Sequence, residues 1–431
     1  MVSQLALLRA LLAPVRSVPP EILAEIFLFL IVLVREKNEV DELLVMNSTV
    51  ARVCAFWRQV AYSTPRLWTR LTMPRIRSMD GYLAHFLPLS GTCLLDLICE
   101  KDPRRRRFRL DGYPGDCHNL RFFVDALRMY TSRWHEVSLH GPLEDFCNLM
   151  PVSTPSLRKV HVTFTSDGPA PTDGLRPMEF FAHAPRLQQL RVDFEYKDPI
   201  ITLPHGSSML TSLEIRVITF SVPLILPALR QCAAKLQLLD LRVSYDSSPS
   251  GHTTVGALAA VGLPAIRRLH LEDKACSLLK LISIPNVEGL CVDYPSLDVP
   301  AVYSTSRGRE MPITKRYLFL EFSEGHSPQW KSADAALLRF LARVKGAEEL
   351  RFYGCKPPSS QVLHGLALRA NTQYILPNLQ RTIFQVYPVA DSGYIDFVHS
   401  RPEMKVIFGE LDVALAAIAL VSLYYFYRDH L

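Results

Sequence analysis

Residues 18–30 read V-P-P-E-I-L-A-E-I-F-L-F-L, and residues 50–71 read V-A-R-V-C-A-F-W-R-Q-V-A-Y-S-T-P-R-L-W-T-R-L. In the first run, apolar residues recur at helical spacing and form one face. This face comprises Ile22, Leu23, Ile26, Phe27 and Leu30. Pro19 and Pro20 suit the start of a helix, because a proline in the first turn loses no hydrogen bond. The first run therefore predicts an amphipathic helix.

The second run predicts another helix, which we expect to begin after Asn47, Ser48 or Thr49. These side chains can accept a hydrogen bond from the first free amides of a helix. The expected apolar face comprises Val50, Val53, Cys54, Trp57 and Ala61. Thr64-Pro65 should end this helix, since the residue before a proline is displaced from the helical region.

Three spaced motifs in this stretch resemble an F-box, in the form common among mushroom-forming (basidiomycete) fungi. They are V-P-P-E-I-L at 18–23, V-C-x-x-W-R at 53–58 and T-P-x-L-W at 64–68. The resemblance covers roughly fifty residues and implies a three-helix motif that docks onto the Skp adaptor of a cullin-RING ubiquitin ligase. Two departures are Val18, where the family has leucine, and the strongly apolar segment from Phe27 to Val34.

By position, the resemblance implies ten adaptor-contacting or supporting residues. They are Pro19, Pro20, Ile22, Leu23, Ile26, Val53, Cys54, Trp57, Leu67 and Trp68. The alternative is a plain helical subdomain whose apolar faces pack only on each other. Two apolar faces and two tryptophans exceed what about fifty residues can bury alone, which favours a docking motif.

The composition is that of a globular protein, with 48% hydrophobic and 21% charged residues in 431. A chain of this length makes two or three domains, unless it forms an elongated repeat fold. A formal charge of +6 is modest for this length and does not indicate nucleic-acid binding. The nine cysteines form no C-x-x-C motif and no paired framework, so we expect small buried hydrophobes in a reducing compartment.

Past Trp68 the chain repeats a pattern of one apolar residue followed by others three and five positions later. Copies begin at Trp68, Trp134, Leu157, Leu187, Leu210, Leu236, Ile266, Val287, Tyr317 and Ala347, with weaker copies at Thr92 and Leu379. The spacing between copies is roughly 20 to 30 residues, as in leucine-rich repeats.

Strand geometry explains the pattern, because successive side chains of a strand point to opposite faces. The residues at +3 and +5 then face inward, and those at +4 and +6 face outward. The outward residues are polar, namely His161 and Thr163, Arg191 and Asp193, Glu214 and Arg216, Asp240 and Arg242, His270 and Glu272, and Glu321 and Ser323. One short parallel strand per repeat would therefore build a sheet with a polar exposed face.

Prolines and helix-like segments separate the copies. Prolines 155, 185, 264, 285 and 377 stand two residues before the first position of a copy, where they cost no ladder hydrogen bond. Segments 178–183, 224–234, 255–261, 333–344 and 360–370 are expected to be helical and to cover the inward face. This part of the chain resembles a degenerate leucine-rich-repeat array, although the usual asparagine after the last apolar residue is absent. An ordinary α/β domain is the alternative.

Motifs for chemistry are missing from the sequence. His135-Glu136-x-x-x-His140 has one residue too many for the zinc-binding helix motif, and no nucleophile motif or phosphate-binding glycine loop occurs. We therefore expect a non-catalytic protein without a cofactor or metal. The basic run Arg104–Arg107 has two interpretations, a nuclear-import signal or acidic-partner contact, and a solvated loop.

Residues 413–427 read V-A-L-A-A-I-A-L-V-S-L-Y-Y-F-Y and carry no charge. This run is shorter than the roughly 20 residues of a membrane-spanning helix. It would suit a helix that caps the last repeat, and it would also suit a membrane-associated tail with an aromatic belt.

The resulting expectation is an α/β protein with a three-helix F-box followed by an irregular leucine-rich-repeat solenoid of one strand and one helix per repeat. The expected segments are an N-terminal lead-in at 1–17, the F-box at 18–71, the solenoid at 72–408 and the apolar cap or tail at 409–431. The resemblance implies a cytoplasmic or nuclear substrate receptor of a Skp–cullin–F-box ubiquitin ligase, with no nucleic-acid partner. The alternative function is a repeat scaffold, tethered to a membrane through 413–427.

The target of such a receptor is expected on the outward face of the strands. The candidate target-binding residues are His161, Arg191, Glu214, Arg216, Asp240, Arg242, His270 and Glu321. The sequence does not name the target protein. His161, Arg191, Arg216 and Arg242 would form an anion site only if the fold brings them together.

Overall fold

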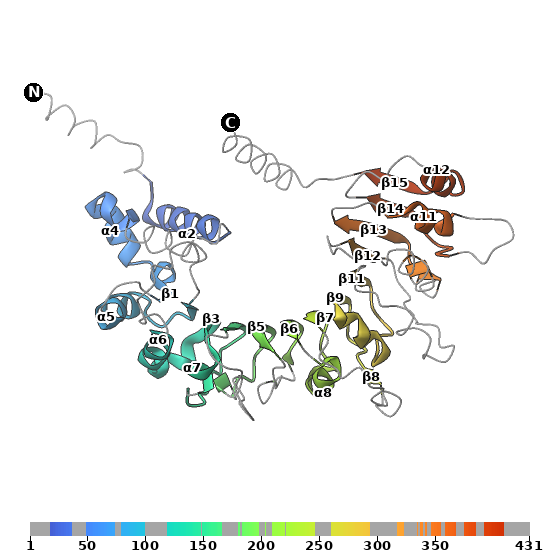
Figure 1. The fold of residues 1–431 in the computed structure, drawn as a ribbon. Coiled ribbons are helices and arrows are strands. Elements are labelled where there is room, and N and C mark those ends of the chain that lie inside the picture. The colour runs from blue at the N-terminus through green and yellow to red at the C-terminus, as the bar shows by residue number, and fades with distance from the viewer. Residues whose placement is uncertain are drawn as a thin grey trace, which may run out of the picture. The chain divides into compact units, whose positions relative to one another are not determined.

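A computed structural model describes 18–36, 49–73, 79–99, 119–147, 149–165, 180–181, 183–197, 203, 209–219, 221–245, 260–293, 317–322, 334, 337–338, 341–342, 346–354, 358–367, 375–384 and 392–408. The fold is mixed α/β, and the strand pairs among the described residues are parallel (Figure 1). The chain divides into two compact units. The first is Met1–Asp167 with Leu175–Leu187 and Pro204–Gly206, and the second is Gly168–Gly174, Gln188–Leu203 and Ser207–Leu431.

The first unit begins with helices. These are α2 at Pro20–Glu36, a helical segment at 49–53, α4 at Ala55–Tyr62 and a short 3-10 helix, η2, at Pro65–Trp68. Pro20 stands at the start of α2, and α4 ends before Thr64-Pro65, so both proline-based expectations are confirmed.

The expected second helix is in fact two. Cys54 is extended, with φ −159° and ψ 171°, and its sulfur accepts a hydrogen bond from the backbone nitrogen of Trp57. Cys54 therefore caps α4 instead of lying on the buried face of one continuous helix. As a consequence Val53 is 56% exposed, although the sequence pattern placed it on the same apolar face as Trp57.

The remainder of the first unit pairs four strands in chain order. The strands are β1 at Arg70–Thr72, β2 at Leu95–Cys99, β3 at Trp134–Pro142 and β4 at Lys159–Thr165. Helices α5 at Met79–Leu89, α6 at Asn119–Leu127, η4 at Arg128–Arg133 and α7 at Leu143–Cys147 connect them. Helices α6 and α7 pack against β3.

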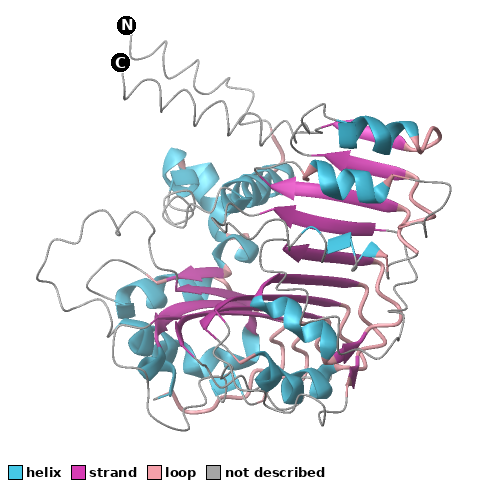
Figure 2. Cartoon of the chain, turned by 45° about the vertical axis from the view of Figure 1, so that its right-hand side comes forward, coloured by secondary structure: helices cyan, strands magenta, loops and turns pink. Residues whose placement is uncertain are grey.

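The second unit holds a parallel sheet of nine strands, which run side by side in Figure 2. They are β5 at Gln189–Lys197, β6 at Ser212–Thr219, β7 at Leu238–Tyr245, β9 at Arg268–Asp273, β11 at Gly289–Asp293, β12 at Tyr317–Phe322, β13 at Glu349–Gly354, β14 at Arg381–Phe384 and β15 at Lys405–Phe408. A separate two-stranded parallel sheet joins β8 at Val261–Gly262 to β10 at Ile282–Ser283.

Helical segments connect the strands of the second unit. They are η7 at Val222–Ile225, α8 at Leu226–Cys232, η9 at Lys274–Lys280, α11 at Ser360–Leu366 and α12 at Ser392–His399. The helix expected at 224–234 is confirmed by η7 and α8, and the one expected at 360–370 by the shorter α11. Residues 180–181, 334, 337–338 and 341 are also helical. Of the helix expected at 255–261, residues 255–259 lie outside the described residues and Val261 belongs to strand β8.

The inward positions of the repeat form the core. Leu213 and Ile215 of β6 are fully buried, as are Leu239 and Leu241 of β7. Burying each such side chain contributes about 1.5–3 kcal/mol. Strands β7 and β9 pack against η9, whose Ala275 and Leu278 are also fully buried. These strands and η9 therefore share one apolar layer.

The pairing register of the strands shows that two copies of the repeat were placed at the wrong residues. Leu290 of β11 lies beside Leu318 of β12, and Leu97 of β2 lies beside Val137 of β3. The copies placed at Tyr317 and Thr92 were therefore wrong by two residues. A shift of two residues along a strand leaves each residue on the same face of the sheet. The alternation of polar and apolar residues therefore did not reveal the wrong placement.

Strand β15 was missed by the sequence pattern. Val406 and Phe408 pair with Thr382 and Phe384 of β14, so the copy would begin at Glu403. A charged residue at the first position hid this repeat.

The prolines between copies have a role that the sequence predicted only in part. Backbone hydrogen bonds join Leu157 to Thr154, Leu187 to Ala184, Ile266 to Leu263, Val287 to Ile284 and Leu379 to Leu376. Each proline is thus the second residue of a tight turn, where its fixed φ is favoured. The turn precedes the strand, so no ladder donor is lost.

Three expectations fall on residues that the structure does not describe, namely the lead-in at 1–17, the basic run Arg104–Arg107 and the apolar segment 413–427. Among the helices that are described, none combines the length and apolar character needed to cross a membrane. Cys99, Cys232 and Cys276 are buried and unbridged, as expected, and burial raises the pKa of the Cys232 thiol to about 11.

Candidate functional site

Helix α2 has apolar side chains on two sides. Leu23 and Phe27 are buried, in a cluster with Val60, Ala61, Leu67 and Trp68 among others. The ring of Phe27 lies 5.0 Å from that of Trp57. On the other side, Ile22, Ile26 and Phe29 are 54%, 43% and 62% exposed. We call these three residues the α2 apolar face.

The buried side of the helical cluster is fixed by specific contacts. The indole nitrogen of Trp68 donates to the carbonyl of Ala61 at 2.8 Å, and the ring of Trp68 meets that of Tyr62 at 5.5 Å. Arg58 donates to the carbonyl of Ala51 at 3.0 Å, which ties α4 to the helical segment before Cys54. The exposed apolar residues therefore stand on a packed support.

The ten residues assigned to adaptor binding divide by exposure. Pro19, Pro20, Ile22, Ile26 and Val53 are exposed, Cys54 and Trp57 are half-buried, and Leu23, Leu67 and Trp68 are buried. The buried three can support a docking surface but cannot touch a partner. Phe29 was not among the ten, although its spacing of seven residues from Ile22 places both on one helix face.

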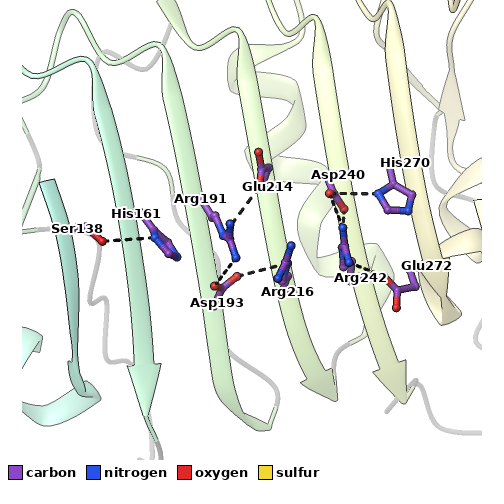
Figure 3. A network of polar contacts seen from close by, with 10 residues as sticks. All are labelled: Ser138, His161, Arg191, Asp193, Glu214, Arg216, Asp240, Arg242, His270 and Glu272. Carbon is purple, nitrogen blue, oxygen red and sulfur yellow. Dashed lines mark hydrogen bonds and ion pairs between the residues drawn. The ribbon is translucent and has the colours of Figure 1, made fainter. Parts of the chain in front are cut away.

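The second candidate surface is the outward face of the strands. In the first unit, the Ser138 hydroxyl of β3 lies 3.4 Å from Nδ1 of His161 on β4. In the second unit, eight charged or titratable residues of β5, β6, β7 and β9 form ion pairs (Figure 3). We call these eight the charged lattice. They are Arg191, Asp193, Glu214, Arg216, Asp240, Arg242, His270 and Glu272.

Hydrogen bonds within the charged lattice concentrate on β5 and β7. Arg191 donates to Asp193 at 3.2 Å, and Arg242 donates to both oxygens of Asp240 at 3.1 and 3.2 Å. Arg242 also reaches Glu272 at 3.0 Å, and Nδ1 of His270 lies 3.1 Å from Asp240. Hydrogen bonds and ion pairs thus hold these side chains in place on β5, β7 and β9.

Asp240 is the most strongly held member of the lattice. Its side chain is only 13% exposed, and burial by itself would raise its pKa. Hydrogen bonds from His270 and Arg242, together with their charge, outweigh burial and lower the pKa of Asp240 to about 2. Asp240 is therefore an anion at physiological pH.

The three arginines of the lattice do not form a shared phosphate site. Arg191, Arg216 and Arg242 all lie against carboxylates of Asp193, Glu214, Asp240 or Glu272. A phosphate would have to compete with these groups. His161 belongs to the first unit, and Glu321 is in β12, where only its backbone is described.

A further buried charge on the same sheet was missed. Glu349 of β13 lies between Arg351 and Arg381, with the Arg381 contact at 3.0 Å. Its position two residues before Arg351 is the signal that could have revealed it, because both point to one face.

No family model matches the chain. No curated protein matches it either. Within the described part of the chain, no three His, Cys, Asp or Glu side chains gather as a metal site requires. Two surfaces of the described residues remain as candidate sites, the α2 apolar face on the helices and the charged lattice on the strands (Figure 3).

Proposed function

We propose that the chain is a non-catalytic substrate receptor of a Skp–cullin–F-box ubiquitin ligase. In this proposal 18–71 is an F-box that binds a Skp-type adaptor, and through it a cullin. The later strands are an irregular leucine-rich-repeat array that binds a target protein. The receptor would act by raising the concentration of target lysines near a ubiquitin thioester carried by another subunit.

The observation that carries the proposal is the α2 apolar face. Three large apolar side chains stand exposed on a helix whose neighbouring side, with Leu23 and Phe27, is buried against α4 and η2. Isolated exposed apolar residues are ordinary, but three at helical spacing resemble the anchors of a helix-mediated interface. The motif resemblance of 18–71 gives this face its expected partner.

The charged lattice supports the second half of the proposal. A face of half-exposed, hydrogen-bonded charges on rigid strands suits specific recognition of another polypeptide. Strand-borne side chains also hold their positions better than loop residues do.

Co-expression of the full chain with a Skp-type adaptor tests the proposal. We expect affinity capture of the chain to retain the adaptor, and the pair to co-elute in size-exclusion chromatography. A folded chain that elutes without the adaptor would contradict it and favour a repeat scaffold with another partner.

A further inference from the structure

Strand β6 carries the charges of the lattice that are least engaged. Glu214 lies 3.9 Å from Arg191, and Arg216 lies 3.8 Å from Asp193. Among the described residues these are their only charged contacts, and both distances exceed that of a hydrogen bond. By contrast, the Arg/Asp pairs of β5 and β7 are hydrogen-bonded within their own strands.

Charge order explains why, within the described part of the chain, β6 forms ion pairs with β5 but none with β7. Along β7 the order is Asp240 then Arg242, and along β6 it is Glu214 then Arg216. Register places Glu214 beside Asp240 and Arg216 beside Arg242. Like charges directly opposite each other on neighbouring strands are unfavourable, so β7 cannot neutralise β6.

The outward column of β6 continues with an apolar residue. Val217 is buried and Ile218 is 41% exposed, so Ile218 follows Glu214 and Arg216 on the outward face. Consecutive outward residues are about 6.6 Å apart along a strand. The column thus offers an anion, a cation and an apolar contact at equal spacing.

We propose that β6 binds an extended segment of the target with a cationic residue for Glu214, an acidic residue for Arg216 and an apolar residue for Ile218. Alternate side chains of an extended chain share one face at the same spacing, so these three residues are separated by two positions each. This inference rests on the proposed function and specifies the chemistry of its target.

Two labelled peptides of equal composition test this inference on the full chain. Both are flanked by serine and threonine, and their central sequences are K-T-D-T-L and D-T-K-T-L. Parallel to β6, the first peptide places its lysine, aspartate and leucine opposite Glu214, Arg216 and Ile218. The second cannot place all three in this way in either direction, because its antiparallel arrangement matches the two charges only by moving its leucine away from Ile218. We expect fluorescence anisotropy to show roughly fivefold tighter binding of the first peptide, because the second loses either the two surface ion pairs or the apolar contact with Ile218.

The double variant Glu214→Arg with Arg216→Glu supplies the matched control, because it reverses the charge order without changing net charge. We expect its preference to reverse in favour of D-T-K-T-L. Equal binding of the two peptides, binding of neither, or an unchanged preference in the variant would overturn the inference.

Adaptor capture on the same protein samples separates this inference from the proposed function. The variant should retain the adaptor as the natural chain does, because β6 lies outside 18–71. Adaptor capture with no peptide discrimination would reject the β6 inference alone. Failure of the unsubstituted chain to bind the adaptor would reject the receptor proposal.

Discussion

Asp240 should make the stability of the second unit sensitive to acid. Its pKa is lowered from 3.8 to about 2, so the unfolded state binds the proton more readily than the folded state. The stabilisation is fully present above pH 3.8 and is lost as the pH falls through about 2. We expect Asp240→Asn to lower the melting temperature at pH 6, with the difference shrinking between pH 4 and pH 2. A constant difference across this range would show that Asp240 does not act through its charge.

Arg401 should be a large single contributor to stability near the end of the described chain. Its side chain is buried and donates to the carbonyls of Leu366, Ile375 and Leu376 at 2.7–3.2 Å. Arg401→Met would remove all of these hydrogen bonds, although the Leu376 carbonyl would keep the one from the Leu379 amide. We expect a loss of about 2–4 kcal/mol in the free energy of unfolding.

Urea denaturation measures this loss, with Arg268→Met as the control. Arg268 is exposed on β9, so its replacement should change stability by less than about 0.5 kcal/mol. Equal effects of the two substitutions would contradict the role assigned to Arg401.

At the scale of elements, substitutions on the α2 apolar face should weaken adaptor binding without destabilising the fold. Ile22→Ser with Ile26→Ser removes two exposed side chains, so we expect adaptor capture to fall at least tenfold while the melting temperature stays nearly unchanged. Glu25→Gln on the same helix is the control, since Glu25 makes only a 3.8 Å contact with the exposed Arg66. Undiminished capture by the double variant would place the docking surface elsewhere.

Leu23→Ala is predicted to behave differently from the exposed pair. Leu23 is 1% exposed in the helical cluster, and truncating a buried leucine costs about 2–5 kcal/mol. We expect this variant to lose stability first and capture as a consequence. Calorimetry alongside capture distinguishes the two cases.

Helix α4 should depend on its cap. Cys54→Ser keeps a side-chain acceptor for the Trp57 amide, whereas Cys54→Val removes it. We expect the valine variant to be about 1 kcal/mol less stable than the serine variant in urea denaturation. Equal stabilities would mean that a side-chain acceptor at position 54 does not stabilise α4.

Across the whole molecule, the strands were more predictable from sequence than the helices. Apolar residues at +3 and +5 are buried in most of the described repeats, so their spacing located most strands without further information. Helix boundaries depended on local capping, and the cap at Cys54 looked like part of a continuous apolar face. Cysteine serves equally as a buried hydrophobe and as a weak acceptor, and the sequence alone does not distinguish these roles.

The sequence predicted which residues make up the candidate surfaces, but not which of them pair with one another. Alternation identified Glu214, Arg216, Asp240 and Arg242 as outward residues. It did not show that Asp240 and Arg242 hold each other while Glu214 and Arg216 do not, because that depends on register between strands. Likewise, the motif at 18–71 did not separate exposed Ile22 and Ile26 from buried Leu67 and Trp68.

The most direct test of the receptor proposal is the molar mass of the co-expressed complex, measured by light scattering during size-exclusion chromatography. The proposal predicts a single peak whose mass equals one 48.8 kDa chain plus one Skp-type adaptor. A folded chain that elutes at its own mass, with the adaptor in a separate peak, would contradict it.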